Sequence, residues 1–328
     1  MATVLVGGSA WAVGHGMTRA PEPAPRATRA RMGLTGPPPP AAAEVGPRPP
    51  AEARSASALA VMDPVRGDDT GCSVADRGRG VYGDPIAIGP GQTLSIPAGI
   101  GRTYDVIVHL HGGAAIQRIL TPENLGPVLV TVDAGVGSNA YRAALADPDV
   151  LTDALERVGV EVGNRAQLKR LIVSSWSAGY GGVREILRQA PASVDAVVLL
   201  DSLHASYDAS GELDPAGLRP FLHHARRARS GEATMVLSHS EIRPPGYAST
   251  SEVADYLLGE LDAQRRYAGM VPGFGVELKT TYDEGGLHVR GLTGTGTDAH
   301  CAHLRLLPQW LRREVLPPRA LNRSSAGP

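Results

Sequence analysis

The stretch Leu171-Ile-Val-Ser-Ser-Trp-Ser177-Ala-Gly-Tyr-Gly-Gly-Val183 joins an apolar run, a turn of mostly small residues and the start of a helix. An apolar run of this kind, rich in β-branched residues, is typical of a buried strand. Ser175 and Gly179 stand two residues before and two residues after Ser177. Both are small enough for a tight turn that holds the central side chain in the open with strained backbone angles. The stretch therefore predicts a strand, a sharp turn that presents Ser177, and a helix.

Apolar runs and helical stretches alternate on both sides of this segment. We expect buried parallel strands at 104–110, 128–132, 171–175, 194–200 and 234–238. We expect helices near 142–158, 178–189, 215–228, 252–266 and 300–315. Antiparallel pairs are expected at 86–88 with 94–96 and at 276–281 with 287–292. This alternation predicts an α/β fold, a three-layer α/β/α sandwich around a doubly wound and mainly parallel sheet.

The two ends of the chain differ in composition from this region. Residues 2–14 form a short apolar run that is similar to a secretory signal but lacks the basic segment before it, so 1–20 are a candidate signal or anchor segment. Residues 21–60 are rich in Pro and Ala and are expected to be a disordered linker. The folded domain is expected at 68–318, followed by a disordered tail at 319–328. Export to the periplasm or the medium and a cytoplasmic location both stay open.

The charge balance argues against a polyanionic partner. The 328 residues include 32 basic and 33 acidic side chains, which give a formal net charge of -1. We therefore expect no nucleic-acid partner. No apolar run reaches the roughly 18 to 20 residues that cross a bilayer, so no transmembrane span is expected. Cys72 and Cys301 are too few for a disulfide scaffold, and whether they pair stays open, as does the oligomeric state.

The turn around Ser177 resembles the GxSxG nucleophile elbow of the α/β-hydrolase superfamily, with Ser175 in place of the first glycine. A second motif, His111-Gly112-Gly113-Ala114, follows the strand expected at 104–110. In the family, a His-Gly at this place opens the loop that gives one oxyanion-hole amide, and the residue after the nucleophile gives the other. The resemblance therefore implies the backbone N–H groups of Gly113 and Ala178 as oxyanion donors.

The resemblance also implies an acid and a base that follow Ser177 in the chain, in that order. The base is expected at the start of the last helix, where His300 is the first choice and His303 the alternative. For the acid, Asp201 directly follows the strand at 194–200, and Glu241 follows the next strand. We favour Asp201 because a short side chain at the end of a strand is held more firmly than a glutamate in a loop.

The resemblance implies acyl transfer through a covalent intermediate on Ser177, with an ester of a small molecule as substrate. An amidase or peptidase on the same triad, and a catalytically silent binding protein with this fold, stay open as alternatives. The candidates for the substrate pocket are His111, Gly112, Trp176 and Tyr180. His109 and His111 face the same way in a strand, as a metal site requires, but no further ligands follow at a suitable spacing. We expect no metal and no cofactor.

Overall fold

The structure, a computed structural model, describes residues 70–163, 165–273 and 275–316. The segments expected at 1–20, 21–60 and 319–328 lie outside the described residues, as do the outermost residues of the domain expected at 68–318. Within the described ranges, no helix is both long and apolar enough to cross a membrane.

A ten-stranded sheet of order β1-β2-β4-β3-β5-β6-β7-β10-β9-β8 forms the centre of the described residues. Its strands are β1 Ile86–Gly89, β2 Gln92–Ser95, β3 Thr103–Leu110, β4 Val128–Val132, β5 Gln167–Trp176, β6 Ala196–Leu200, β7 Thr234–His239, β8 Arg266–Gly273, β9 Val276–Glu284 and β10 Leu287–Leu292. The six strands from β4 to β10 in this order are parallel, whereas β1 and β2 at one edge and β9 and β8 at the other are antiparallel. The expected mainly parallel sheet is confirmed.

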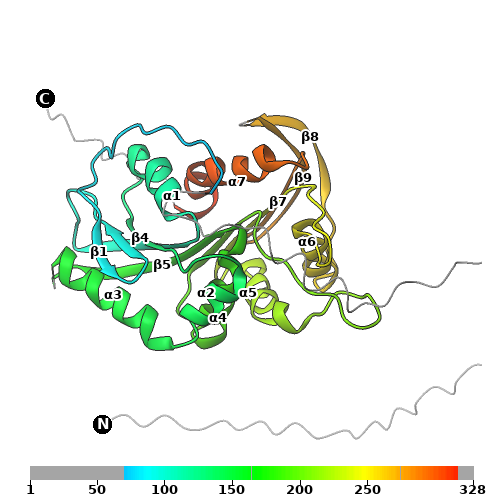
Figure 1. The fold of residues 1–328 in the computed structure, drawn as a ribbon, viewed down its shortest axis with the longest axis horizontal. Coiled ribbons are helices and arrows are strands. Elements are labelled where there is room, and N and C mark those ends of the chain that lie inside the picture. Colours follow the sequence, from blue (N-terminus) through cyan, green and yellow to red (C-terminus); the bar gives the residue numbers. More distant parts are fainter. Residues whose placement is uncertain (1–69, 164, 274, 317–328) are drawn as a thin grey trace, which may run out of the picture. The chain divides into compact units, whose positions relative to one another are not determined.

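Helices cover both faces of this sheet (Figure 1). They are α1 Gly113–Leu120, α2 Ser138–Ala144, α3 Pro148–Val162, α4 Tyr180–Gln189, α5 Arg219–Arg229, α6 Thr250–Gly259 and α7 Thr297–Trp310, which continues into the π-helical turn η5 Leu311–Val315. Apolar residues of α1, α7 and η5 pack in one core, and those of α2 to α6 pack in another. The expected three layers are therefore present.

Each central strand contributes side chains to both cores. In β3, Val106 and Val108 belong to the core under α2 to α6, whereas Ile107 between them belongs to the core under α1 and α7. Val173 and Ile172 of β5 divide in the same way. Because alternate side chains point to opposite faces and both faces are covered, these strands have continuous apolar sequences.

Three elements differ from the expectations. The helix expected at 142–158 is two helices, because the Asp147 side chain accepts a hydrogen bond from the Asp149 N–H (3.0 Å) and caps a new helix that starts at Pro148. Strand β8 was not expected, and the helix expected near 252–266 ends at Gly259, before β8 begins at Arg266. Helix α1 was not expected either, since Gly112 and Gly113 indicated a loop, yet α1 begins at Gly113 and buries a stripe of apolar residues.

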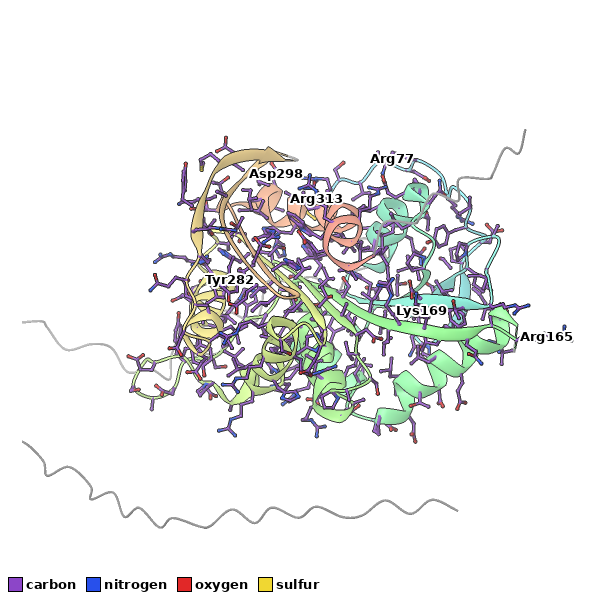
Figure 2. The ribbon with its side chains drawn as sticks, turned by 180° about the vertical axis from the view of Figure 1, so that it is seen from behind. Arg77, Arg165, Lys169, Tyr282, Asp298 and Arg313 are labelled. Carbon is purple, nitrogen blue, oxygen red and sulfur yellow. A yellow bond between two sulfur atoms is a disulfide. The ribbon has the colours of Figure 1, made fainter. Side chains whose placement is uncertain are left out.

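The parallel strands end at nearly the same level. Ligands of such a sheet bind beyond the carboxyl ends of its strands. Leu110 of β3 is level with Ser175, Trp176 with Leu200, and Leu200 with Ser238. The amino end of β5, where Arg165 and Lys169 lie, points away from these carboxyl ends (Figure 2). The residues that follow β3, β5, β6 and β7 therefore lie together at the carboxyl ends of the parallel strands.

Close packing explains why small residues follow Ser177. A Cβ atom on Gly179 would lie 2.2 Å from the Leu110 carbonyl oxygen, and one on Gly181 would lie 1.9 Å from the carbonyl oxygen of Ser138 in α2. Glycine at these positions allows α4 to lie directly against β3 and α2.

We expect Gly181→Ala to lower the free energy of unfolding by about 1–3 kcal/mol, because the new methyl group forces α4 away from α2. The matched control is Gly159→Ala in α3, where the nearest atom to a new Cβ is the Tyr104 hydroxyl at 4.0 Å. That change should raise the free energy of unfolding by up to about 1 kcal/mol through helix propensity. Urea unfolding measures both, and equal effects would contradict the packing explanation.

Candidate active site

Ser177 lies on a sharp turn between β5 and α4. It begins the 3-10 turn η3 (Ser177–Gly179), and its φ of 49° is in the left-handed region that residues other than glycine rarely adopt. The Ser202 hydroxyl donates to the Ser177 carbonyl (2.8 Å), and the hydroxyl oxygens of Ser202 and Ser175 are 2.8 Å apart. Ser175 therefore helps to connect this turn to the loop after β6.

Asp201 and His300 form the central contact of the site. The Nδ1 atom of His300, in the first turn of α7, lies 2.7 Å from Oδ2 of Asp201. Asp201 follows β6 directly, is 2% exposed, and has a φ of 44°. The histidine and the acid that the sequence favoured are thus in contact.

Neighbouring histidines and hydrogen bonds together hold the buried Asp201 carboxylate in its charged form. Oδ1 accepts from the Ser240 N–H (2.9 Å) and from the Thr250 hydroxyl (2.6 Å). Burial alone would raise the pKa of Asp201, but the nearby His303 and His300 and the hydrogen bonds from His300 and Thr250 outweigh it and hold the pKa well below its usual range. Sequence reasoning missed Ser240 and Thr250.

Trp176 connects the serine turn to the histidine. Its indole N–H donates to the His300 carbonyl (3.1 Å), and its ring centroid lies 4.5 Å from that of the His300 imidazole. Trp176 is only 3% exposed, so it supports His300 more than it lines a pocket. Among the described residues the Ser177 hydroxyl makes no hydrogen bond, so its contact with His300 stays a prediction; such contacts often tighten only when substrate binds.

A disulfide between Cys72 and Cys301 lies next to His300 in sequence. It joins residues 229 positions apart, and a crosslink across so long a loop stabilises the fold by about 5 kcal/mol through chain entropy. A Cβ on Gly112 would be 3.0 Å from the Thr70 methyl group and 3.4 Å from the Trp176 ring. The segment before Cys72 therefore lies against the motif that follows β3.

The two alternative residues have other partners. His303 is fully buried, and its Nδ1 atom is 2.8 Å from the Ser238 hydroxyl, while Nε2 has no hydrogen-bond partner among the described residues. Glu241 forms an ion pair with Lys279 (2.6 Å) and accepts from the Gly294 N–H (3.1 Å). The structure brings His300, not His303, into hydrogen-bonding contact with Asp201.

The Gly113 amide has a different partner from the one expected. The N–H groups of Gly112 and Gly113 donate to the Asp133 carboxylate at 3.0 Å and 3.2 Å. In this conformation an oxyanion role for Gly113 requires that bond to open. Ala178 is the second residue of η3, where the first N–H groups have no partner within the helix, so its oxyanion role stays a prediction.

Two of the remaining pocket candidates lie among aromatic rings near the site. His111 stacks on Trp176 with centroids 5.3 Å apart, and its Nδ1 atom is 2.8 Å from the Tyr141 hydroxyl. Tyr180 is half-buried at the start of α4, and the Arg184 guanidinium lies 5.3 Å from its ring centroid. Gly112, by contrast, is buried, with a φ of 79°, and precedes α1.

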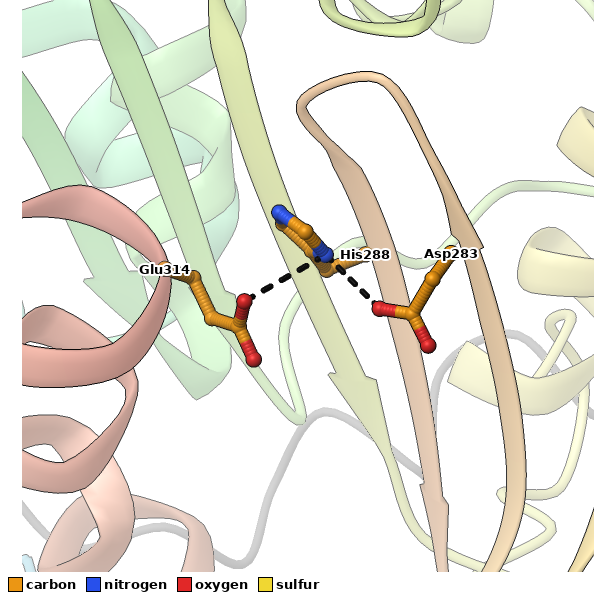
Figure 3. A group of neighbouring side chains, drawn as sticks. All are labelled: Asp283, His288 and Glu314. Atoms are coloured by element: carbon orange, nitrogen blue, oxygen red, sulfur yellow. Dashed lines mark hydrogen bonds and ion pairs between the residues drawn. The ribbon is translucent and has the colours of Figure 1, made fainter.

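The described residues contain one cluster with the side chains of a metal site, shown in Figure 3. Nδ1 of His288 lies 2.8 Å from Asp283 and 3.4 Å from Glu314. The Arg290 guanidinium lies 2.5 Å from Asp283 and 2.8 Å from Glu314, so it already supplies a positive charge. His288 is near the amino end of β10, whereas Asp201 follows the carboxyl end of β6, so the two lie at opposite ends of the parallel strands. We interpret this cluster as an ion-pair network that attaches η5 to β9 and β10.

Both ring nitrogens of the buried His109 have partners within the protein. Nδ1 of His109 is 3.0 Å from the Ser174 hydroxyl and Nε2 is 2.9 Å from the His111 carbonyl, so both ring nitrogens are engaged.

A cavity of about 1220 Å³ lies beyond β7, and its lining includes His239, Glu241 and Arg265. Neither Ser177 nor His300 is among the residues that line it.

No protein-family model matches the sequence, and no curated protein matches it. Solved structures similar to this chain include the enterobactin esterase of Shigella flexneri (15% identity, 66% of this chain, 53% of that chain, TM-score 0.41) and the acylaminoacyl peptidase of Pyrococcus horikoshii (15%, 68%, 39%, 0.41). Another is the S-formylglutathione hydrolase of Staphylococcus aureus (11%, 70%, 95%, 0.38). The chain thus spans about half, or less, of the first two. Each is a likeness of fold, and the α/β architecture itself rests on the strand order and helices described above.

Buried neutral histidines should make the protein sensitive to acid. Burial lowers the pKa of His109 to about 3 and the pKa of His303 to about 4, whereas an unfolded histidine has a pKa of about 6.5. The unfolded chain therefore binds more protons, and the free energy of unfolding should fall as the pH drops from about 6.5 to 4. In His303→Gln the slope should be smaller by up to about 1.4 kcal/mol per pH unit. Urea unfolding at several pH values measures the slope.

The exposed His223 provides the matched control for this change, since His223→Gln also removes one imidazole. A slope that is the same in wild type and in His303→Gln would show that burial of His303 does not link folding to protonation.

Proposed function

We propose that the protein is a serine hydrolase that cleaves an ester of a small molecule by acyl transfer to water. The observation that carries this proposal is the 2.7 Å contact between His300 and the buried Asp201, in a site that also holds the strained turn of Ser177. Such a pair orients an imidazole and stabilises its protonated form, which a weak serine nucleophile requires.

In the proposed reaction, Nε2 of His300 accepts the Ser177 proton as the serine oxygen attacks the ester carbonyl. Asp201 holds Nδ1, which leaves Nε2 as the ring nitrogen that can accept a proton. The Ala178 amide stabilises the tetrahedral oxyanion. The alcohol leaves with the proton from His300, and a water molecule, activated by His300 in turn, then releases the acid. An amide or peptide bond can follow the same steps, and a panel of substrates separates the two activities.

A catalytically silent binding protein is the second candidate. It is favoured by the hydrogen bond from the Gly113 amide to Asp133, which occupies one of the two expected oxyanion donors. Covalent labelling of the nucleophile distinguishes this candidate from the enzyme.

A fluorophosphonate probe should label the folded wild-type protein and should not label Ser177→Ala, because only a serine activated by a base attacks the phosphorus atom at a useful rate. Labelled protein is detected by gel fluorescence and the site by mass spectrometry. The control is Ser210→Ala, which removes an exposed serine away from this turn and keeps the nucleophile. A folded wild-type protein that stays unlabelled would remove the enzyme proposal.

Paired variants should identify the base and the acid. We expect His300→Gln and Asp201→Asn to lower kcat for a 4-nitrophenyl ester by about 10⁴-fold or more, the range seen when triad residues are replaced. His303→Gln and Glu241→Gln are the matched controls and should retain most of the activity. Full activity in Asp201→Asn would transfer the acid role away from Asp201, and equal mild losses in both histidine variants would show that neither is the base.

A further inference from the structure

The ring–ring contacts of the described residues are concentrated around the proposed site. Only 4% of the residues are Phe, Trp or Tyr. Among the described residues there are five ring pairs, and all of them belong to two groups. One group consists of His300 and the rings that connect to it, namely Trp176, His111 and Tyr141. The other group consists of Tyr180, His204 and Tyr247, which we call the aromatic row.

The aromatic row is attached to the loops that carry the proposed nucleophile and acid. Tyr180 stands three residues after Ser177, and His204 stands three residues after Asp201. The ring centroids of Tyr180 and His204 are 5.8 Å apart with a 63° angle between the planes, and those of His204 and Tyr247 are 5.0 Å apart at 89°. Both tyrosines thus contact His204 edge-on, and neither is stacked flat against it.

The orientation of His204 is fixed by its backbone contact. Its Nδ1 atom lies 3.0 Å from the Ala248 carbonyl, the residue after Tyr247. The Ala248 N–H in turn donates to the Ala205 carbonyl (2.8 Å). These contacts join the loop after β6 to the loop that carries Tyr247, so the row has a defined shape before any ligand binds.

Tyr247 offers the ring surface that a ligand could cover. It is 44% exposed, although a tyrosine that serves only the core is normally buried. Tyr180 is covered further, because the Arg184 guanidinium lies 5.3 Å from its ring centroid. Tyr247 is therefore the accessible member, and Tyr180 and His204 hold it in place.

The charges near the row decide between two kinds of ligand that bind to aromatic rings. A cationic ligand on the row would be repelled by Arg184, because the positively charged guanidinium already lies against the Tyr180 ring. Burial lowers the pKa of His204, so this ring is neutral at pH 7 and adds no charge of its own to the row. A neutral, flat ring fits these conditions, since it stacks on or meets a tyrosine ring edge-on without a charge to desolvate.

We infer that the aromatic row is a subsite for an aryl group of the ester substrate, with Tyr247 as the residue that contacts it. The inference rests on the proposed serine hydrolase activity and adds the substrate class. The aryl group belongs to either the acid or the alcohol part of the ester, and matched substrates distinguish the two sources.

The test compares esters that differ only in aromaticity. For the acid part, these are 4-nitrophenyl benzoate and 4-nitrophenyl cyclohexanecarboxylate; for the alcohol part, they are benzyl acetate and cyclohexylmethyl acetate. The ratio of kcat/KM within each pair is divided by the ratio of the uncatalysed rates. We expect wild type to favour the aryl member of one pair by about three- to tenfold, the size of a specific ring–ring contact.

Three variants connect this preference to the aromatic row. In Tyr247→Leu, which keeps apolar bulk but loses the ring, the corrected ratio should fall to within about twofold of one. It should survive in Tyr247→Phe, because the ring remains. Tyr267→Leu is the control, since Tyr267 is 67% exposed on β8 and is not part of the row. Equal thermal midpoints show that the variants are folded.

The outcomes separate the inference from the function on which it rests. A wild type that is labelled at Ser177 and hydrolyses 4-nitrophenyl acetate, yet shows a corrected ratio of one for both pairs, would overturn the aryl subsite alone. A preference that is unchanged in Tyr247→Leu would overturn the role of Tyr247. A wild type that is neither labelled nor active would overturn the subsite together with the proposed function.

Discussion

The buried carboxylate of Asp201 is the constraint around which the site is arranged. A charge that is 2% exposed is stable only when hydrogen bonds replace its hydration. Here the donors come from three directions: Ser240 after β7, Thr250 at the start of α6, and His300 at the start of α7. Satisfying one buried charge therefore fixes how two helices approach the sheet, and it places the imidazole at the same time.

The fold was largely predictable because its central strands are buried on both faces. Their apolar runs are distinctive, and the break at Asp147-Pro148 carries its own capping signal in the sequence. Helix α1 was missed because it begins with the glycines that indicated a loop, and only its later apolar spacing identifies it. Strand β8, with the sequence RYAGMVPG, alternates poorly and contains glycine and proline, so no local pattern predicts it.

The candidate site was predictable where position along the chain decides it, and not where tertiary contacts do. Asp201 was favoured because it directly follows a strand, and it indeed contacts His300. Thr250 escaped notice, although the capping box of Ser249 and Glu252 beside it is a local signal for the true start of α6. The hydrogen bond from the Gly113 amide at the start of α1 to Asp133 just after β4 joins residues 20 positions apart, so it has no local signature.

The Cys72–Cys301 bridge has a topological consequence. It closes a covalent ring that contains every strand of the described sheet as well as Ser177 and Asp201, and His300 is the last residue before the bridge. The exposed turn at 206–212 lies inside that ring. A protease that cuts there would leave two fragments joined through sulfur, and His300 would separate from Ser177 and Asp201 only after the bridge is reduced. Because of this one covalent bond, a cut in the backbone opens the chain locally and does not release a fragment.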